Sequence, residues 1–474
     1  MRLLRLSMRT AAAVGAAAVL VAGCSRAGGG SSSSSSPAAS ASSGAASSAS
    51  SSAAGGASFG TLSNVCHGGS ASGAPDQGVT SGTIKIGVLT DEEYNKDPDL
   101  PNTAKVFADW CNAAGGIDGR KIVPVLHQTN LLAVVAAMTA ACSSDFVLAG
   151  GSAALDGLAV NTRLKCLLPD FNAQPVMAQN QGSALQLTPY TSSPVYSGYA
   201  GYYKWLLQKY PDSADHVAVL SGQSVITEID SSIVVQTVKA DGGTVAYNGT
   251  FPPVGVTNWA PYAQTLKAKG IKGLTFYDTP QDLIALEQAL DNIGYHLDWI
   301  DANSNAYGTS FIQIAGKALT EQNNYASLPG IWPVEKASAN PAVKMILQLF
   351  QQYAPGQPVT LQVELGFSTL LLFAVSAESC GANLTRSCIY QAALKQTAWT
   401  GGGISAPTNE ATPTAAPTCY NIEQANASGW QVATGFTPNT DGTYSCGQEG
   451  TVKLSGIPSP AQLSDVGKSL SDLK

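Results

Sequence analysis

Cysteine is the residue type whose number and spacing in this sequence point most directly to chemistry. The chain has 474 residues and nine cysteines, one of which, Cys24, lies close to the N-terminus. The other eight are Cys66, Cys111, Cys142, Cys166, Cys380, Cys388, Cys419 and Cys446. An even set in an exported protein is typical of disulfides, because exported proteins fold in an oxidising compartment. Spacing favours the pairs Cys142–Cys166, Cys380–Cys388 and Cys419–Cys446, which leaves Cys66–Cys111 by elimination.

A metal centre is the competing interpretation of these cysteines, and the sequence supports it poorly. Structural zinc sites use closely spaced cysteine pairs together with histidines. The chain has no C-x-x-C pair and only four histidines, none at ligand spacing from another. We therefore predict no metal site, and nothing in the sequence indicates a cofactor.

Three sequence signatures of common enzyme classes are also missing. The chain contains no H-E-x-x-H, no P-loop and no G-x-G-x-x-G motif. The paired carboxylates Asp91 and Glu92 fall on a polar loop, where we expect them to be solvated rather than to act as acid and base. These observations favour a binding protein over an enzyme.

Residues 1–24 have the pattern of an export signal. Arg2, Arg5 and Arg9 precede an apolar run from Ala11 to Ala22 that is too short to span a bilayer. The run ends in Leu20-Val21-Ala22-Gly23-Cys24, which resembles the bacterial lipobox. That resemblance implies a lipid-modified Cys24 and a protein anchored to the outer face of the cell membrane. The alternative is an ordinary signal peptide followed by an unrelated cysteine.

Residues 25–58 consist almost entirely of Ser, Ala and Gly and carry one charge, Arg26. Such a tract cannot bury enough apolar surface to fold, so we expect a disordered tether. The remaining 416 residues are enough for a body of two lobes. Charged residues make up 12% of the chain, with 25 basic against 32 acidic. An acidic chain with so few cations argues against nucleic acid as a partner.

The body alternates short apolar runs with amphipathic segments. Strands are predicted at 83–89, 121–128, 146–150 and 166–168, with helices starting near Asn102 and covering 132–142 between the first three. The pattern then restarts, with strands predicted at 217–220, 244–247, 273–277 and 299–302 and helices at 225–240, 259–269 and 283–293. Further helices are predicted at 341–353 and 365–378, the latter as a buried core helix despite its apolar run. Strands that alternate with helices indicate α/β lobes with parallel sheets, here two of them, joined by a hinge of three connections.

Three segments resemble the type I periplasmic binding proteins of the leucine/isoleucine/valine-binding class. The segment from Asn112 to Ile122 reads N-A-A-G-G-I-D-G-R-K-I, and the others are 258–270 and 381–386. The resemblance implies two Rossmann-like lobes, the first formed by 59–190 plus 306–405 and the second by 191–305 plus 406–474. It also implies an extracytoplasmic protein that captures a small, amino-acid-like solute and delivers it to an ABC permease. A sensing or adhesion protein of the same fold is the alternative.

In open α/β sheets ligands bind beyond the carboxyl ends of the strands, so the site is expected between the two lobes. In amino-acid binders of the resembling family, residues after the third and fourth strands hold the ligand carboxylate. Here the Gly-rich loop after the third strand offers Ser152 and Ala153, whose N–H groups suit an anion. Ser152 could equally be the N-cap of a helix. After the fourth strand stand Phe171 and Asn172, where the family has small hydroxyl residues.

In the second lobe an acidic residue after the third strand often meets the ligand ammonium in that family. Asp278 and Asp282 stand in that loop, and Thr279 followed by Pro280 looks like a helix N-cap with Asp282 as its capping partner. Asp278 is therefore the better candidate. Tyr94 and Trp259 are candidate aromatic walls of the pocket, although each could be ordinary packing.

Overall fold

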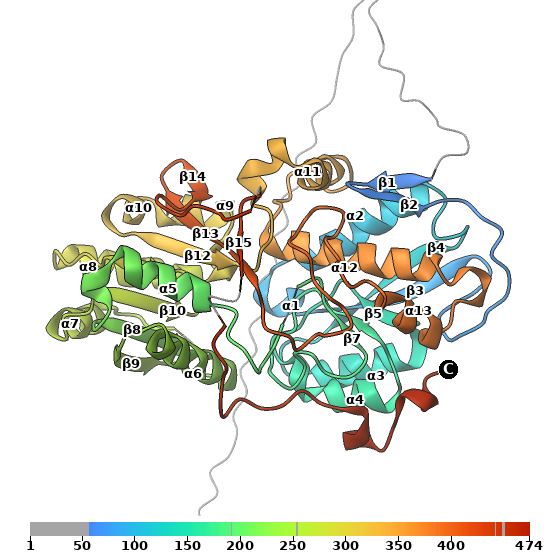
Figure 1. Ribbon diagram of the computed structural model, residues 1–474, viewed down its shortest axis with the longest axis horizontal. Coiled ribbons are helices and arrows are strands. Elements are labelled where there is room, and N and C mark those ends of the chain that lie inside the picture. Colours follow the sequence, from blue (N-terminus) through green and yellow to red (C-terminus); the bar gives the residue numbers. More distant parts are fainter. Residues whose placement is uncertain (1–55, 191, 253–254, 441, 448–450) are drawn as a thin grey trace, which may run out of the picture. The chain divides into compact units, whose positions relative to one another are not determined.

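The structure is a computed structural model that describes residues 56–474 except 191, 253–254, 441 and 448–450 (Figure 1). The expected signal peptide, Cys24 and most of the expected tether lie outside the described residues. The last two tether residues, Ala57 and Ser58, belong to strand β1 (Ala57–Phe59), which pairs antiparallel with β2 (Leu62–Cys66).

The first large sheet has five parallel strands in the order β4-β3-β5-β6-β7. Its strands are β3 (Thr83–Thr90), β4 (Lys121–Gln128), β5 (Val147–Ala149), β6 (Asp170–Phe171) and β7 (Gln186–Leu187). Successive side chains of a strand point to opposite faces, and the core residues divide accordingly. Val147 and Ala149 join one apolar cluster, whereas Leu148 joins another.

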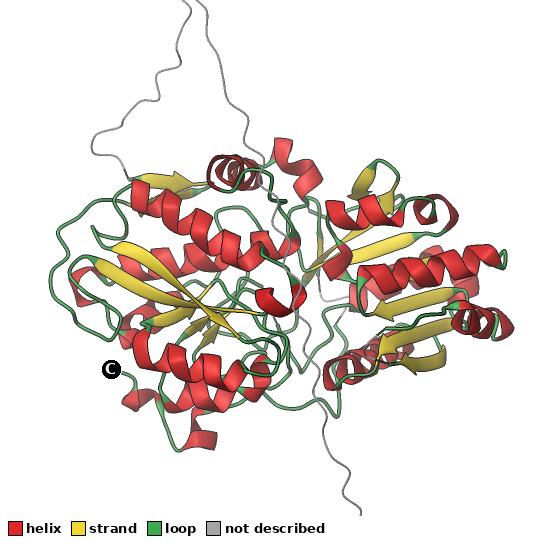
Figure 2. Cartoon of the chain, turned by 180° about the vertical axis from the view of Figure 1, so that it is seen from behind, coloured by secondary structure: helices red, strands yellow, loops and turns green. Residues whose placement is uncertain are grey.

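Helices cover both faces of this sheet (Figure 2). One face carries α2 (Asp99–Ala113) and α12 (Leu361–Glu378), which pack against each other, with α11 (Pro341–Tyr353) and α13 (Arg386–Ala393) beside them. The other face carries α3 (Val134–Ser144) and α4 (Val160–Lys165). Among the described residues, α12 is the helix long and apolar enough to cross a membrane, but 83% of it is buried inside the protein. It is a core helix, as the sequence predicts.

The second sheet repeats this arrangement. Its parallel strands are ordered β9-β8-β10-β11-β12, and β13, β14 and β15 extend it in antiparallel fashion to eight strands. The strands are β8 (Val217–Gly222), β9 (Val245–Phe251), β10 (Gly273–Tyr277), β11 (Trp299–Asp301), β12 (Asn324–Leu328), β13 (Cys419–Asn426), β14 (Gly429–Val432) and β15 (Ser445–Cys446). In both parallel parts the first strand in sequence lies between the second and the third, so the two lobes have the same topology.

Helices again lie on both faces of the second sheet. The apolar cluster on one face contains residues of α5 (Ala200–Lys209) and α6 (Val225–Ala240). The opposite face carries α7 (Ala260–Ala268) and α8 (Pro280–Asn292). Two shorter helices, α9 (Thr309–Ala315) and α10 (Ala318–Glu321), contact α8 and lead into β12.

The chain returns to the first lobe later than the sequence suggests. Residues 309–328 are expected in lobe one, but they form α9, α10 and β12, and β12 pairs in parallel with β11. The return follows β12 instead. The physical reason is that β11 has an unpaired edge, and β12 pairs with that edge before β13 is added on the other side of β12.

The C-terminal residues make a further passage between the lobes. The first connection between the lobes lies between β7 and α5, the second directly after β12, and the third between α13 and β13. Lys453 forms a β-bridge to Tyr196 in the first connection, and Ala461 exchanges backbone hydrogen bonds with Gln179 and Ala184 of the first lobe. Leu463 and Leu473 are then buried against α4. Figure 1 shows this red tail running from the second lobe towards α4. The segment from 461 onwards therefore packs with lobe one rather than with lobe two.

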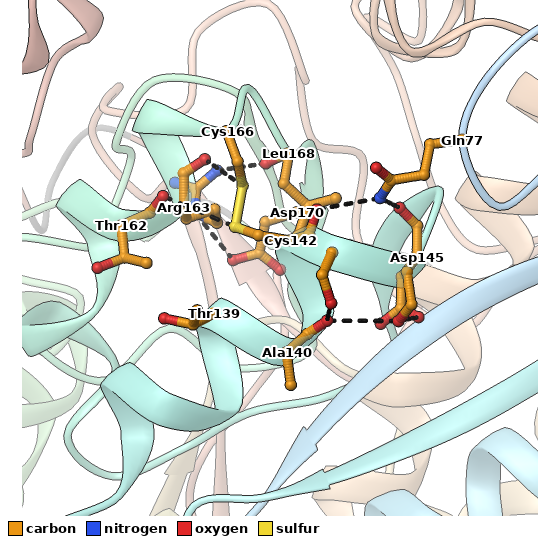
Figure 3. Close-up of a disulfide and its surroundings, with 12 residues drawn as sticks. Gln77, Thr139, Ala140, Cys142, Asp145, Thr162, Arg163, Cys166, Leu168 and Asp170 are labelled. Carbon is orange, nitrogen blue, oxygen red and sulfur yellow. Dashed lines mark hydrogen bonds and ion pairs between the residues drawn. A yellow bond between two sulfur atoms is a disulfide. The ribbon is translucent and has the colours of Figure 1, made fainter.

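All four disulfides predicted from spacing are confirmed: Cys66–Cys111, Cys142–Cys166, Cys380–Cys388 and Cys419–Cys446. Figure 3 shows Cys142–Cys166, which joins α3 to the end of α4. Beside it the buried Arg163 guanidinium lies 3.8 Å from the Asp170 carboxylate and donates to the carbonyl of Leu168. The disulfide and this ion pair together fix the turn that leads into β6.

Candidate ligand-binding site

The parallel strands of each lobe all end at one edge of their sheet, and polar loops follow them there. In the first lobe these loops follow β3, β4, β5 and β6, and in the second they follow β8, β10 and β11. Crevices beyond such carboxyl edges are where open α/β sheets bind ligands. The candidate site is therefore built from these two sets of loops.

Asp91, directly after β3, holds three of the first-lobe loops together. Its carboxylate accepts hydrogen bonds from the Thr129 hydroxyl, from the N–H of Leu131 at 2.9 Å and from the N–H of Ala154 at 2.7 Å. The sequence predicts a solvated Asp91, but the side chain is buried. The correction follows from these bonds, because they replace the water that a buried carboxylate would lose.

The serine of the Gly-rich loop after β5, Ser152, forms hydrogen bonds within the first lobe. The Ser152 hydroxyl donates to the carbonyl of Gln174 at 2.5 Å, and its N–H donates to the carbonyl of Leu89 at 3.0 Å. Ser152 is not a helix N-cap, because the next helical turn begins at Asp156 with Leu155 at the cap position. Outside helices and strands, the described backbone hydrogen bonds include none from the N–H of Gly151 or Ala153. These two amides are thus the groups of the loop that could bind an anion.

Phe171 and Asn172 are both buried in the first lobe: Phe171 is the last residue of β6, and Asn172 begins the loop after it, as expected. The expected fourth strand at 166–168 is a turn, and the strand is β6 at Asp170–Phe171. Phe171 is fully buried with its ring centroid 5.8 Å from that of Phe373. Asn172 donates to Asp170 at 3.1 Å and accepts from the N–H of Gln174. Both side chains therefore shape the lobe from inside.

A buried carboxylate that the sequence analysis does not identify organises the segment after β6. Asp156 accepts hydrogen bonds from the N–H groups of Val176 and Met177, each at 2.9 Å, and from the Asn180 amide at 2.8 Å. Burial raises the pKa of Asp156 to about 7, although these donors oppose the shift. No motif marks this residue in the sequence, because its partners lie 20 to 24 positions away.

In the second lobe Asp278 is exposed at the end of β10, as the sequence predicts for a residue on this loop. Its carboxylate accepts from the N–H of Thr279 at 2.8 Å. A Cβ at Gly222, the last residue of β8, would lie 1.9 Å from Asp278 Oδ2, so a larger residue there would displace the Asp278 side chain. Desolvation by neighbouring atoms raises the pKa of Asp278. A cationic partner would lower this pKa, because it stabilises the ionised carboxylate. Thr279 caps α8 and Asp282 is its partner, which confirms that prediction.

Behind this edge lies a buried hydrogen-bond network that fixes α5 against the sheet. Asp301, the last residue of β11, accepts from the hydroxyls of Tyr203 at 2.7 Å and Tyr202 at 3.2 Å. The Tyr203 hydroxyl is also 2.9 Å from that of Thr275 on β10. Burial raises the pKa of Asp301 to about 6. In the sequence, Asp301 is marked only by its position near the end of the strand predicted at 299–302.

The two candidate aromatic walls occupy different environments. Trp259 is 5% exposed and packs on Phe251, at a ring distance of 4.9 Å, and on Phe276. It is a core residue. Tyr94, in the short helix α1 (Glu92–Asn95) after β3, is 62% exposed and remains available to a ligand.

Two hollows lined by described residues include none of the predicted site residues. One lies between the first and third connections, with Thr188, Tyr190 and Glu410 among its lining, and the other is at the surface near Asp241 and Lys453. The candidate site is therefore defined by the loops at the carboxyl edges of the two sheets and not by either hollow. Among the described residues, no group of three or more His, Cys, Asp or Glu side chains is arranged to hold a metal ion.

One enzyme-like motif needs a structural interpretation. Gly56-Ala57-Ser58-Phe59-Gly60 has the letters of the G-x-S-x-G motif of serine hydrolases. That motif requires a sharp strand-to-helix turn that exposes the serine. Here the segment is β1 and its turn into β2, and Ser58 accepts a hydrogen bond from Asn64. The context that the motif needs is therefore missing.

Comparison with known proteins extends these observations. A family model described as periplasmic binding protein matches residues 83–429. Among solved structures, a fatty acid ABC transporter substrate-binding protein from Thermomonospora curvata shares 17% identity at a TM-score of 0.68, covering 83% of this chain and 99% of that chain. A leucine-binding protein from Thermotoga maritima shares 14% at 0.60, covering 74% and 98%. A solute-binding protein from R. palustris in complex with benzoate shares 13% at 0.60, covering 74% and 95%. A comparison with curated protein sequences gave no match.

The family match begins at the first residue of β3 and ends at the first residue of β14, so it spans both parallel sheets. The solved structures agree with it in fold. The chain belongs to the periplasmic binding protein family and has the type I fold of two α/β lobes.

Proposed function

We propose that this protein is an extracytoplasmic, lipid-anchored substrate-binding protein that captures one small polar solute between its lobes and delivers it to an ABC permease. The observation that carries the proposal is the duplicated sheet topology within the family match, with polar loops at both carboxyl edges. Substrate-binding proteins of this family bind their ligands without chemical change. A sensing or adhesion role for the same binding event remains the alternative.

The solute that we favour is amino-acid-like. The N–H groups of Gly151 and Ala153 offer an anion site on one lobe, with the Ser152 loop around them, and Asp278 offers a partner for an ammonium on the other. Such a pair of groups suits a zwitterion held across the two edges. Tyr94 would contribute an exposed aromatic surface beside it. The similar structures include a fatty acid ABC transporter substrate-binding protein, a leucine-binding protein and a complex with benzoate, so carboxylates without an ammonium group belong in any screen.

A thermal-shift screen tests this proposal. Binding to the folded state raises stability by RT ln(1 + [L]/Kd), so a solute at 100 times its Kd adds about 2.7 kcal/mol. We expect at least one amino acid or related carboxylate to raise the Tm, and Asp278→Asn to weaken the effect of a zwitterion but not of a simple carboxylate. No shift with any amino acid, amide, fatty acid or aromatic acid would contradict the proposal.

The lipid anchor has its own test. Replacement of Cys24 by Ser removes the thiol that a lipobox modifies, so the variant should leave the membrane fraction while remaining exported. Fractionation followed by immunoblotting measures this. A Cys24→Ser protein that stays with the membrane would show that another segment holds it there.

A further inference from the structure

Three glutamates meet at the junction between the lobes, and the ligand site does not use them. Glu335 lies in the 3-10 helix Val334–Ala339 that follows the second connection, Glu364 in the first turn of α12, and Glu423 in β13. Helix α12 covers the first sheet and β13 belongs to the second. The cluster therefore joins elements of both lobes.

Tyr307 lies at the centre of this group. Its hydroxyl donates to Glu335 Oε2 at 2.6 Å and accepts from the N–H of Val334 at 2.9 Å. The tyrosine interacts electrostatically with all three glutamates. Close by, the Gln362 amide donates to Asn305 Oδ1 at 3.0 Å, which ties the start of α12 to the loop after β11.

Glu364 and Glu423 are fully buried carboxyls, both with 0% exposure. The oxygens of Glu364 have no hydrogen-bond partner among the described residues, and Glu423 lies against the carboxyl of Glu335 rather than against an N–H donor. Lys336 is the cation that faces Glu423. Burial, reinforced by the nearby Glu335, raises the pKa of both carboxyls well above the usual range.

Such a cluster is stable only while its buried carboxyls carry protons. An ionised carboxylate in an apolar environment costs several kcal/mol unless water or a cation reaches it. Two ionised neighbours also repel each other. The structure can relieve both costs if the start of α12 and the second-lobe segments beside it part enough to admit water, because two lobes joined by hinges can move apart without unfolding.

We propose that Glu364 and Glu423, which both interact with Glu335, form a proton-operated latch between the start of α12 in one lobe and β13 in the other, closed while these two buried carboxyls are protonated and opened as they ionise. The groups that titrate or carry charge in the latch are these three glutamates, Tyr307 and Lys336. Burial raises the pKa of Tyr307. Asp99 of α2 faces the latch as well: it accepts from the hydroxyl of Thr360, the N-cap of α12, and burial raises its pKa to about 6. The latch is independent of the identity of the solute.

Hydrogen–deuterium exchange of the purified protein tests the latch. Exchange rates of peptides covering β13 and the first turn of α12 are measured at pH 5, 7 and 9 and corrected for the intrinsic effect of pH. We expect the corrected exchange to rise about tenfold or more between pH 5 and 9, the equivalent of about 1.4 kcal/mol of opening. Far-UV circular dichroism should show that both lobes stay folded.

Glutamine variants test whether the buried glutamates cause the rise in exchange with pH. In an Asp99→Asn background, which removes the titration of Asp99, Glu364→Gln with Glu423→Gln should abolish the rise, because glutamine is neutral at every pH. Glu287→Gln is the matched control, since Glu287 is also fully buried with unpartnered oxygens but lies in α8. It should retain the wild-type response at the junction. If the double variant fails to fold, Glu423→Gln alone should reduce the rise.

Two results would overturn the latch. One is a wild-type protein whose junction exchanges equally at all three pH values. The other is a glutamine variant whose junction responds to pH as the wild type does.

Discussion

Buried carboxylates carry much of the local organisation of this protein, and Asp91 is the clearest case. One side chain at the end of β3 accepts from residues that follow β4 and β5, so it fixes the relative positions of three loops. Asp156 and Asp301 act similarly after β6 and within the second lobe. None of the three is part of a recognisable motif, because each one's partners are distant in sequence.

Replacing Asp91 by Asn should destabilise the protein. An amide cannot accept as many hydrogen bonds as a carboxylate, so we expect the free energy of unfolding to fall by about 1–3 kcal/mol. Chemical denaturation measures the change. Asp109→Asn is the control, because the side chain of Asp109 is 42% exposed and forms a surface ion pair with Lys105, and it should cost less than about 0.5 kcal/mol. Equal effects of the two substitutions would show that Asp91 does not hold the loops.

At the scale of elements, sequence periodicity predicts the repeated α/β units well. The predicted limits of α6, α11, β4 and β10 match the structure residue for residue, because capping and turn residues mark their ends. The fourth strand is misplaced, because the apolar triplet 166–168 looks more like a strand than Asp170–Phe171 does. Asp170 can occupy a buried strand only because Arg163 lies beside it, and that pairing is a property of the fold. The same limit applies to Phe171, which the misplaced strand assigns to a loop but which lies in β6.

The C-terminal tail is an element that composition alone does not reveal. Its residues Leu463 and Leu473 bury apolar surface against Val160 and Leu164 of α4. Leu463→Ala should therefore lower the free energy of unfolding by about 2–5 kcal/mol, since it leaves a cavity in that cluster. Leu470→Ala serves as the comparison, because Leu470 is 53% exposed and should be nearly neutral. A neutral Leu463→Ala in denaturant titrations would mean that the tail does not contribute to the first lobe.

For the whole molecule, the many buried acids predict a distinctive response to pH. Burial raises the pKa of Asp156 and Asp230 to about 7 and that of Glu287 and Glu410 to about 8. A carboxyl with a raised pKa binds its proton more tightly in the folded state, so stability falls as pH rises from its unfolded pKa to its folded pKa. His67, whose pKa is also raised, loses its contribution in the same direction. The low content of charged residues, 12%, leaves few cations to compensate.

We therefore expect the protein to be more stable at pH 5.5 than at pH 8. The loss approaches about 1.4 kcal/mol per pH unit for each buried group that lies between its two pKa values. Urea midpoints across this range measure the effect, and Glu287→Gln should flatten part of it. A midpoint that is constant or rises with pH would contradict this account of the buried acids.

The central claim is that one solute bridges the carboxyl edges of two similar lobes, and a crystal structure of the complex tests it most directly. The solute is the compound that gives the largest thermal shift, co-crystallised with the protein. The account predicts that it contacts the loop at residues 150–154 of the first lobe and Asp278 of the second, with its covalent structure unchanged. A solute bound to one lobe alone, bound away from both edges, or converted to another compound would contradict it.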